Sequence, residues 1–249
     1  MEAEAIVLRH YPLSESSRIV VFFTREYGKL RAVADGIKKP NSHMAGALEP
    51  FNHVMIEFWF REGKDLGRIR GADLIGIFPG KAMDIPRIYS CTYFAEIINE
   101  TTQENQANHA LFRLLLASMK AASASIPTAA LVRYFEIWTL RLNGFLPNLN
   151  RCSICGKGII DDGFFAWIES GEARCRNCAG GVGLFVSAKS ALLLEKMMKL
   201  PPEEFMILPF EQEAAFELER FTQRFLSFNL ERQLKSWPLL REILNPDIS

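Results

Sequence analysis

Residues 18–35 read RIVVFFTREYGKLRAVAD, and this stretch decides the first part of the fold. Every residue from 19 to 24 is β-branched or aromatic, as strands prefer, and Tyr27-Gly28 then supplies a turn signal. After the turn, small or aliphatic residues alternate with charged or larger ones up to residue 37. A period of two indicates a strand with one buried face. The stretch therefore predicts two strands, over residues 18–24 and 29–37, joined by a turn.

Three further runs of the same character lie within the first 80 residues. They cover residues 3–11, 54–60 and 66–78, and the last contains glycines that suit bulges or bends. Five strands in about 75 residues are too few for two packed sheets, whereas closure into a small barrel removes the exposed strand edges. The sequence therefore predicts a five-stranded barrel domain over residues 1–80.

Helical periodicity replaces alternation after residue 80. The pattern predicts helices from residue 85 onward, around residues 111–115, up to residue 142, and over residues 188–200, 211–230 and 238–244. The segment 148–184 interrupts this pattern, since it is rich in Gly and Cys and too small to hold a core unaided. We therefore predict an α+β multidomain protein, in which a helical domain (81–147 and 185–249) carries residues 148–184 as an inserted zinc ribbon.

The four cysteines of this insertion form two pairs with metal-ligand spacing. Cys152-x2-Cys155 and Cys175-x2-Cys178 are separated by 19 residues, and glycines follow each pair. Four thiolates satisfy tetrahedral zinc completely and leave no open position, which is typical of a structural site. Redox pairs or disulfides are the alternatives. The fifth cysteine, Cys91, falls on an apolar helical face and is expected to be a buried small hydrophobe.

The formal net charge is zero, but the charges are unevenly placed along the chain. Six basic residues lie between positions 17 and 40: Arg18, Arg25, Lys29, Arg31, Lys38 and Lys39. Cations on the strands of a small barrel are typical of single-stranded nucleic-acid binding, with aromatic rings as base platforms. Tyr11, Tyr27 and Phe51 are candidates for that stacking. A solvated face is the alternative for the charges, and Phe22, Phe23, Phe58 and Trp59 fit the barrel core better.

Common catalytic signatures are missing from the sequence. It contains no phosphate-binding Gly-x4-Gly-Lys-Ser/Thr loop, no Gly-x-Ser-x-Gly elbow and no His-Glu-x2-His helix, and its four histidines are scattered. We therefore expect a binding protein and not an enzyme. The acidic start lacks the pattern of a secretory signal, and no apolar window is long enough for a membrane span, so a cytoplasmic location without a membrane partner is expected.

Several stretches together resemble a known family. They are residues 5–8, 12–17, 23–31, 34–39, 46–51, 133–136 and 142–144. The most specific is Gly-Ala-Leu-Glu-Pro-Phe at 46–51, which follows the basic loop. From end to end, the chain resembles the bacterial RecO family of recombination mediators.

The resemblance implies an oligonucleotide/oligosaccharide-binding (OB) barrel, a helical domain and a zinc module with one structural ion. It also implies binding to single- and double-stranded DNA, annealing of complementary strands, and help in loading the recombinase RecA onto DNA coated by the single-strand-binding protein (SSB). The implied protein partners are RecR and the acidic C-terminal tail of SSB, and the implied location is the nucleoid. By the same resemblance, Arg133 lies where a cation holds the carboxylate of that tail.

Two other functions remain open at this stage. The barrel could contact protein in place of nucleic acid, which would make the chain an interaction adaptor. Alternatively, the zinc ribbon could belong to an RNA-binding protein. Competition by polyanions would distinguish the adaptor, and preference for RNA over DNA would distinguish the RNA-binding protein.

Overall fold

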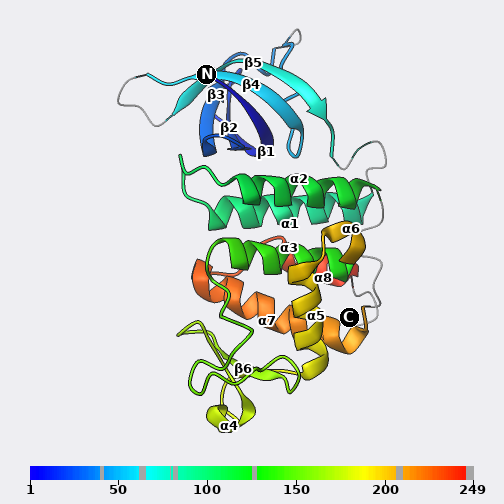
Figure 1. The fold of residues 1–249 in the computed structure, drawn as a ribbon. Coiled ribbons are helices and arrows are strands. Elements are labelled where there is room, and N and C mark those ends of the chain that lie inside the picture. The colour runs from blue at the N-terminus through cyan, green and yellow to red at the C-terminus, as the bar shows by residue number, and fades with distance from the viewer. Residues whose placement is uncertain are drawn as a thin grey trace. The chain divides into compact units, whose positions relative to one another are not determined.

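The computed structural model describes residues 1–39, 42–61, 66–78, 80, 84–124, 128–205 and 210–244. Contacts divide the chain into two compact units, one made of residues 1–126 with 236–249 and the other of residues 127–235. Each unit is described by itself (Figure 1).

The first unit begins with a closed barrel of five strands. These are β1 (Glu2–Pro12), β2 (Arg18–Thr24), β3 (Gly28–Ala34), β4 (His53–Trp59) and β5 (Gly67–Gly76), in the order β1-β2-β3-β5-β4. All neighbours are antiparallel except β3 and β5, which run parallel. The strand pattern predicts this closed five-stranded barrel, and its OB type agrees with the family resemblance.

Alternation along the strands fills the barrel and also creates a second buried surface outside it. Val20, Phe22 and Leu30 point into the barrel core. Ile6 and Phe23, which are paired in register between β1 and β2, point the other way and are nevertheless fully buried. The outer side of β1 and β2 is therefore covered around Ile6 and Phe23, whereas Arg9 and Tyr11 near the end of β1 are exposed.

Two helices of the same unit provide this cover. They are α1 (Ile85–Thr101) and α2 (His109–Ala124), which lie side by side against the barrel in Figure 1. The ring of Phe112 on α2 lies 6.3 Å from that of Phe23. The connection between the helices also contacts β3. A Cβ atom on Gly28, which has φ +70°, would lie only 1.9 Å from the carbonyl oxygen of Gln106. Glycine is therefore required there on both counts.

The seam between β3 and β5 is the shortest ladder of the barrel. In the described residues it consists of the pairs Ala32–Gly67 and Val33–Arg68, whereas β1–β2 and β2–β3 have seven pairs each. The unit is completed by α8 (Trp237–Leu244), whose Trp237 ring packs against Tyr93 of α1.

The second unit combines helices with a small sheet. The helices are α3 (Ala129–Leu142), α4 (Arg176–Ala179), α5 (Ala188–Lys199), α6 (Pro202–Phe205) and α7 (Gln212–Leu230). The strands β6 (Phe164–Trp167), β7 (Glu172–Arg174) and β8 (Leu184–Val186) form an antiparallel sheet in the order β7-β6-β8. Helix α3 packs on α7, and Ser187 caps α5 by accepting from the Ser190 amide.

The predicted fold class is confirmed, because the barrel, the helical part and the four-cysteine cluster are all present. The sequence pattern did not reveal the three strands beside the cysteines or the short helices α4 and α6. The boundaries 1–80, 81–147 with 185–249, and 148–184 stay a prediction, since the contacts group α1 and α2 with the barrel. Among the described helices, none combines the length and apolarity that a membrane crossing requires.

Candidate metal site and nucleic-acid interface

Two backbone knuckles bring the four predicted cysteines together. In the first, the Cys152 amide donates to the carbonyl of Lys157 and the Gly156 amide donates to the carbonyl of Cys152, with Gly156 at φ +71°. In the second, Cys175 caps α4, and the helix ends at Gly180 in the left-handed conformation. These tight turns direct both thiols of each pair to the same side.

The sulfur geometry fits a tetrahedral metal. All four Sγ atoms lie within 4.8 Å of one another, and those of Cys155 and Cys175 are 3.7 Å apart. Zinc–sulfur bonds of about 2.3 Å at tetrahedral angles place sulfurs about 3.8 Å apart. Cys152 and Cys175 are buried and Cys155 is exposed. The residues therefore form a closed four-sulfur site able to bind a metal ion.

The pKa values of the clustered thiols also favour binding of a cation. Burial disfavours the Cys152 thiolate, but hydrogen bonds from the backbone amides of Cys155, Cys175 and Ile154 outweigh it and lower the pKa of Cys152 to about 6. The pKa of Cys178 rises to about 12, mainly because its thiol hydrogen-bonds to the sulfur of Cys175 and, to a smaller extent, to that of Cys155. The sulfurs thus compete for protons, and a bound divalent ion removes this competition by deprotonating its ligands.

Cys91 is separate from the cluster. It lies on α1, fully buried, and burial raises the pKa of its thiol to about 12. An inert hydrophobic role follows for this residue, as expected from its apolar helical face.

Three of the six predicted DNA-binding cations form ion pairs with glutamates. Arg18 pairs with Glu49 at 2.9 Å, Arg25 with Glu4 at 2.6 Å and Arg31 with Glu104 at 2.7 Å. The guanidinium of Arg25 also lies 5.5 Å from the centroid of the Phe112 ring. All three pairs are partly exposed to solvent. These side chains hold the barrel to its loops and helices in this conformation.

The three lysines differ in their surroundings. Lys29 donates to the carbonyl of Asn99 on α1 at 2.5 Å, in a partly buried position. Lys38 and Lys39 follow β3 on an exposed loop, where the ammonium of Lys38 donates to the carbonyl of Ser14 at 2.8 Å. The Lys38 amide also donates to the Ser16 carbonyl at 3.1 Å. Two loops are thereby held together, with both lysine head groups at the surface.

The aromatic candidates also separate into two groups. Tyr11 and Tyr27 are 40% and 36% exposed, whereas Phe51 is half-buried. Phe22 and Phe58 lie in the barrel core as expected. Phe23 lies under α2 instead, and Trp59 points outward beside β5, so neither belongs to the barrel core.

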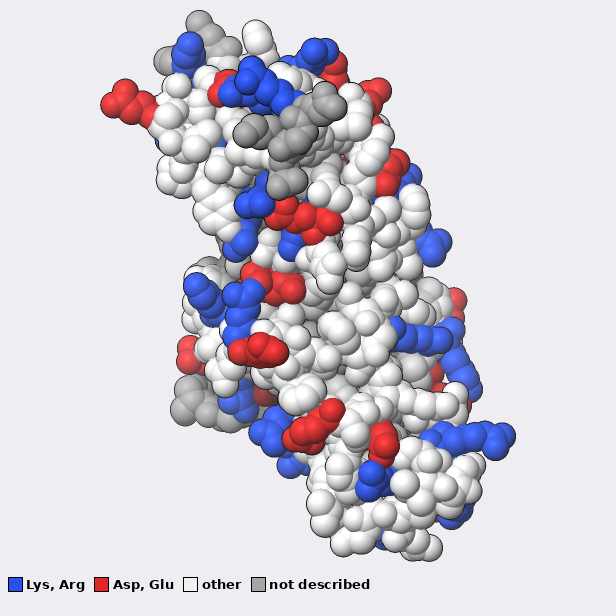
Figure 2. All heavy atoms as spheres, turned by 90° about the vertical axis from the view of Figure 1, so that its left-hand side faces the viewer, with Lys and Arg blue, Asp and Glu red and all other residues white. Residues whose placement is uncertain are grey.

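Several exposed cations of the barrel were missed by sequence reasoning. Arg9 lies on β1, Arg61 follows β4, and Arg68 and Arg70 lie on β5. All four are outside the stretch 17–40 that contains the six predicted cations. The alternation of Arg68 and Arg70 with Gly67 and Ile69 was the signal that could have found two of them. On the face drawn in Figure 2, the coloured side chains of the barrel's described residues mix basic and acidic groups.

Arg133 lies in a buried polar network on α3. It is 2% exposed and donates to Glu136 at 2.9 Å and to Thr222 of α7 at 3.2 Å. The carboxylate of Glu136 also accepts from Gln223 at 2.7 Å. The contact with a partner's carboxylate stays a prediction, and it requires Arg133 to leave this network.

Comparisons with known proteins agree with this architecture. The family model described as recombination protein O N terminal matches residues 1–78, and the one described as recombination protein O C terminal matches residues 82–238. The chain is 32% identical to the DNA repair protein RecO of Koribacter versatilis, over 97% of this chain and 98% of the relative. It is also 32% identical to the DNA repair protein RecO of Geobacter metallireducens, over 98% of both chains. The chain therefore belongs to the RecO family of DNA repair and recombination proteins.

Proposed function

We propose that the protein is a non-catalytic recombination mediator that binds single- and double-stranded DNA through its barrel. It anneals complementary strands and helps to load RecA onto SSB-coated DNA. The observation that carries this proposal is a closed five-stranded barrel with exposed cations, in a chain of the RecO family. Acting on chromosomal DNA, the protein works in the cytoplasm, at the nucleoid.

Lys38 and Lys39 bind the first phosphates in this proposal. Both are exposed, and their loop is fastened to the loop between β1 and β2 at Ser14 and Ser16. Loops at this end of an OB barrel commonly line the nucleic-acid path. Arg18, Arg25, Lys29 and Arg31 bind phosphates secondarily. Each must exchange a protein partner for a phosphate, which lowers its net contribution.

Charge reversal of the two lysines tests the proposal. The Lys38→Glu/Lys39→Glu variant should bind a labelled oligothymidine more weakly in fluorescence anisotropy. The slope of log affinity against log salt concentration should become shallower by about 1.4, or about 0.7 for each single-strand phosphate that the protein no longer neutralises. The matched control is Arg113→Glu/Lys120→Glu, which makes the same charge change on exposed positions of α2. Equal affinity and slope for the two double variants would refute the assigned loop.

The same titration separates the two rival functions. An interaction adaptor would ignore both the oligonucleotide and heparin, whereas an RNA-binding protein would prefer an oligouridine to the thymidine strand. Binding to DNA that heparin displaces, with no preference for RNA, is the result expected here. Annealing is then followed with two complementary strands in the presence of SSB.

We further propose that the metal is zinc and that its role is structural. The four sulfurs leave no open position for water or substrate, and the sheet β7-β6-β8 beside them has too few residues for a core of its own. RecR and the SSB tail are the proposed protein partners. The tail's terminal carboxylate suits an arginine fork, so Arg133 would bind it after exchanging Glu136 for the tail.

A further inference from the structure

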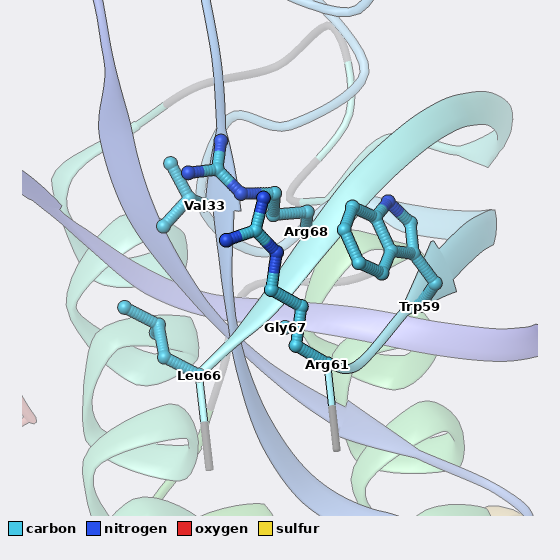
Figure 3. Close-up of a pocket in the computed structure, with 6 residues that line it drawn as sticks. All are labelled: Val33, Trp59, Arg61, Leu66, Gly67 and Arg68. Carbon is cyan, nitrogen blue, oxygen red and sulfur yellow. The ribbon is translucent and has the colours of Figure 1, made fainter. Parts of the chain in front are cut away.

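A small pocket opens on the outer surface of the barrel at the β3–β5 seam. Val33, Trp59, Arg61, Leu66, Gly67 and Arg68 line it, and its volume is about 210 Å³. Figure 3 shows the side chains of Arg61 and Arg68 extending into the space between Val33 and the Trp59 ring. Ligand pockets for drug-sized molecules begin at about 300 Å³, so this one suits a single planar group.

Strand register explains why these side chains meet. Trp59 of β4 is paired with Arg68 of β5, and Arg68 is paired with Val33 of β3. Phe58 points into the barrel core, so its neighbour Trp59 must point outward. At Gly67 a Cβ atom would approach the Phe60 ring to 3.1 Å, so the missing side chain leaves room for this ring beside β5. The sequence thus places an indole, a guanidinium and an aliphatic side chain in one outward row.

The pocket combines an aromatic surface with positive charge. The guanidinium of Arg61 lies 5.8 Å from the centroid of the Trp59 ring. That of Arg68 forms an ion pair with Asp35, so it must exchange this partner to bind a phosphate. The side chain of Arg68 remains 45% exposed. No acidic residue is among the described residues that line the pocket. An aromatic face for a base with cations for the adjacent phosphates is the chemistry that holds single-stranded nucleic acid.

The same row ends in a second aromatic–arginine pair. From Val33 the register continues to Ile19 of β2 and then to Tyr11 of β1. Tyr11 is 40% exposed, and the guanidinium of Arg9 lies 4.9 Å from the centroid of its ring. Four strand spacings separate Tyr11 from Trp59, or about 19 Å along the barrel surface. A short stretch of single strand can therefore follow the row from one aromatic ring to the other.

We propose that the pocket at the β3–β5 seam binds one base of single-stranded DNA, stacked on Trp59, with the flanking phosphates on Arg61 and Arg68. This site rests on the proposed function, since it deepens the DNA binding assigned to the barrel. Its indole and both arginines come from residues 59–68 and not from the Lys38–Lys39 loop, and it adds base stacking to the phosphate binding proposed there.

The Trp59→Ala variant tests the stacking, with anisotropy of a labelled oligothymidine as the readout. Removing the indole should lower the affinity about 5- to 150-fold, the range expected when one stacking partner is removed. The effect should disappear with an abasic oligomer of the same length, because no base is then present to stack. The matched control is Trp167→Ala, which removes an aromatic–arginine pair from β6, where Arg174 lies 4.1 Å from the ring centroid.

Arg61→Gln tests the phosphate binding and serves as the second variant if Trp59→Ala does not fold. It should weaken binding and lower the salt slope by about 0.7. If wild-type affinity persisted in a folded Trp59→Ala variant or in Arg61→Gln, the pocket would be excluded. In that case a weakened Lys38→Glu/Lys39→Glu variant would still support the proposed function. If the wild-type protein bound no oligonucleotide, the proposed function itself would fail.

Discussion

Replacing Glu136 with Gln should destabilise the second unit strongly, although the two side chains have nearly the same shape. Glu136 is fully buried, and its carboxylate accepts from Arg133, Thr222 and Gln223. The substitution removes the negative charge that faces Arg133 in this network and leaves the guanidinium, 2% exposed, without this carboxylate. It also turns an amide donor toward groups that donate themselves.

The size of this destabilisation follows from removing the charge of only one partner of a buried ion pair. Such changes cost about 3–5 kcal/mol, a large share of the ~5–15 kcal/mol that typically stabilises a domain. For a unit of this size the melting temperature should fall by more than about 10 °C. Replacing both partners, as in Arg133→Met/Glu136→Leu, removes both charges and should recover most of this stability.

Urea unfolding followed by circular dichroism, with metal kept in the buffer, gives the free energies for wild type, Glu136→Gln, the single variants Arg133→Met and Glu136→Leu, and the double variant. The double-mutant cycle then yields the coupling between Arg133 and Glu136. Breaking a buried pair should cost about 3–5 kcal/mol, so a destabilisation below about 1 kcal/mol for Glu136→Gln would refute the reasoning. It would show that water or a partner reaches Arg133, as the proposed binding of the SSB tail requires.

Two further predictions concern the second unit. Cys155→Ser should lose the bound ion and melt at a lower temperature, whereas Cys91→Ala should keep the ion. Metal analysis beside a thermal melt measures both, and loss of DNA binding at unchanged stability would contradict a structural metal. Burial raises the pKa of Glu217, but hydrogen bonds from Ser187 outweigh it, so the net pKa is lowered. Its contribution to stability is therefore present above the unfolded value of 4.5 and is lost as the pH falls through the lower folded value. Glu217→Gln should therefore flatten the loss of stability on acidification below pH 4.5.

The sequence predicts the elements well because their signals are local. Each barrel strand shows β-branched residues or alternation, and Ser187 caps a helix as expected from its position before an apolar period. The strands beside the cysteines have only three or four residues each, which is too short for a period to appear. The spacing of the cysteines predicts the metal site, because the geometry of metal coordination constrains that spacing.

The surroundings of the proposed DNA-binding residues could not be predicted from the sequence, because they depend on residues far apart in the chain. Nothing near Arg31 indicates that Glu104 lies beside it. Likewise, Trp59 resembles a core residue in sequence, since the strand around it is apolar and aromatic. Only closure of the barrel shows that the residue points outward, next to Arg68.

The short ladder between β3 and β5 has a dynamic consequence. Local opening needs least free energy where the fewest backbone hydrogen bonds must break, so amide protons that bond across the β3–β5 seam should exchange with heavy water before those of the β2–β3 ladder. An oligonucleotide bound across this seam would hold β3 and β5 together. Slower amide exchange at this seam and binding of the oligonucleotide would then report the same equilibrium.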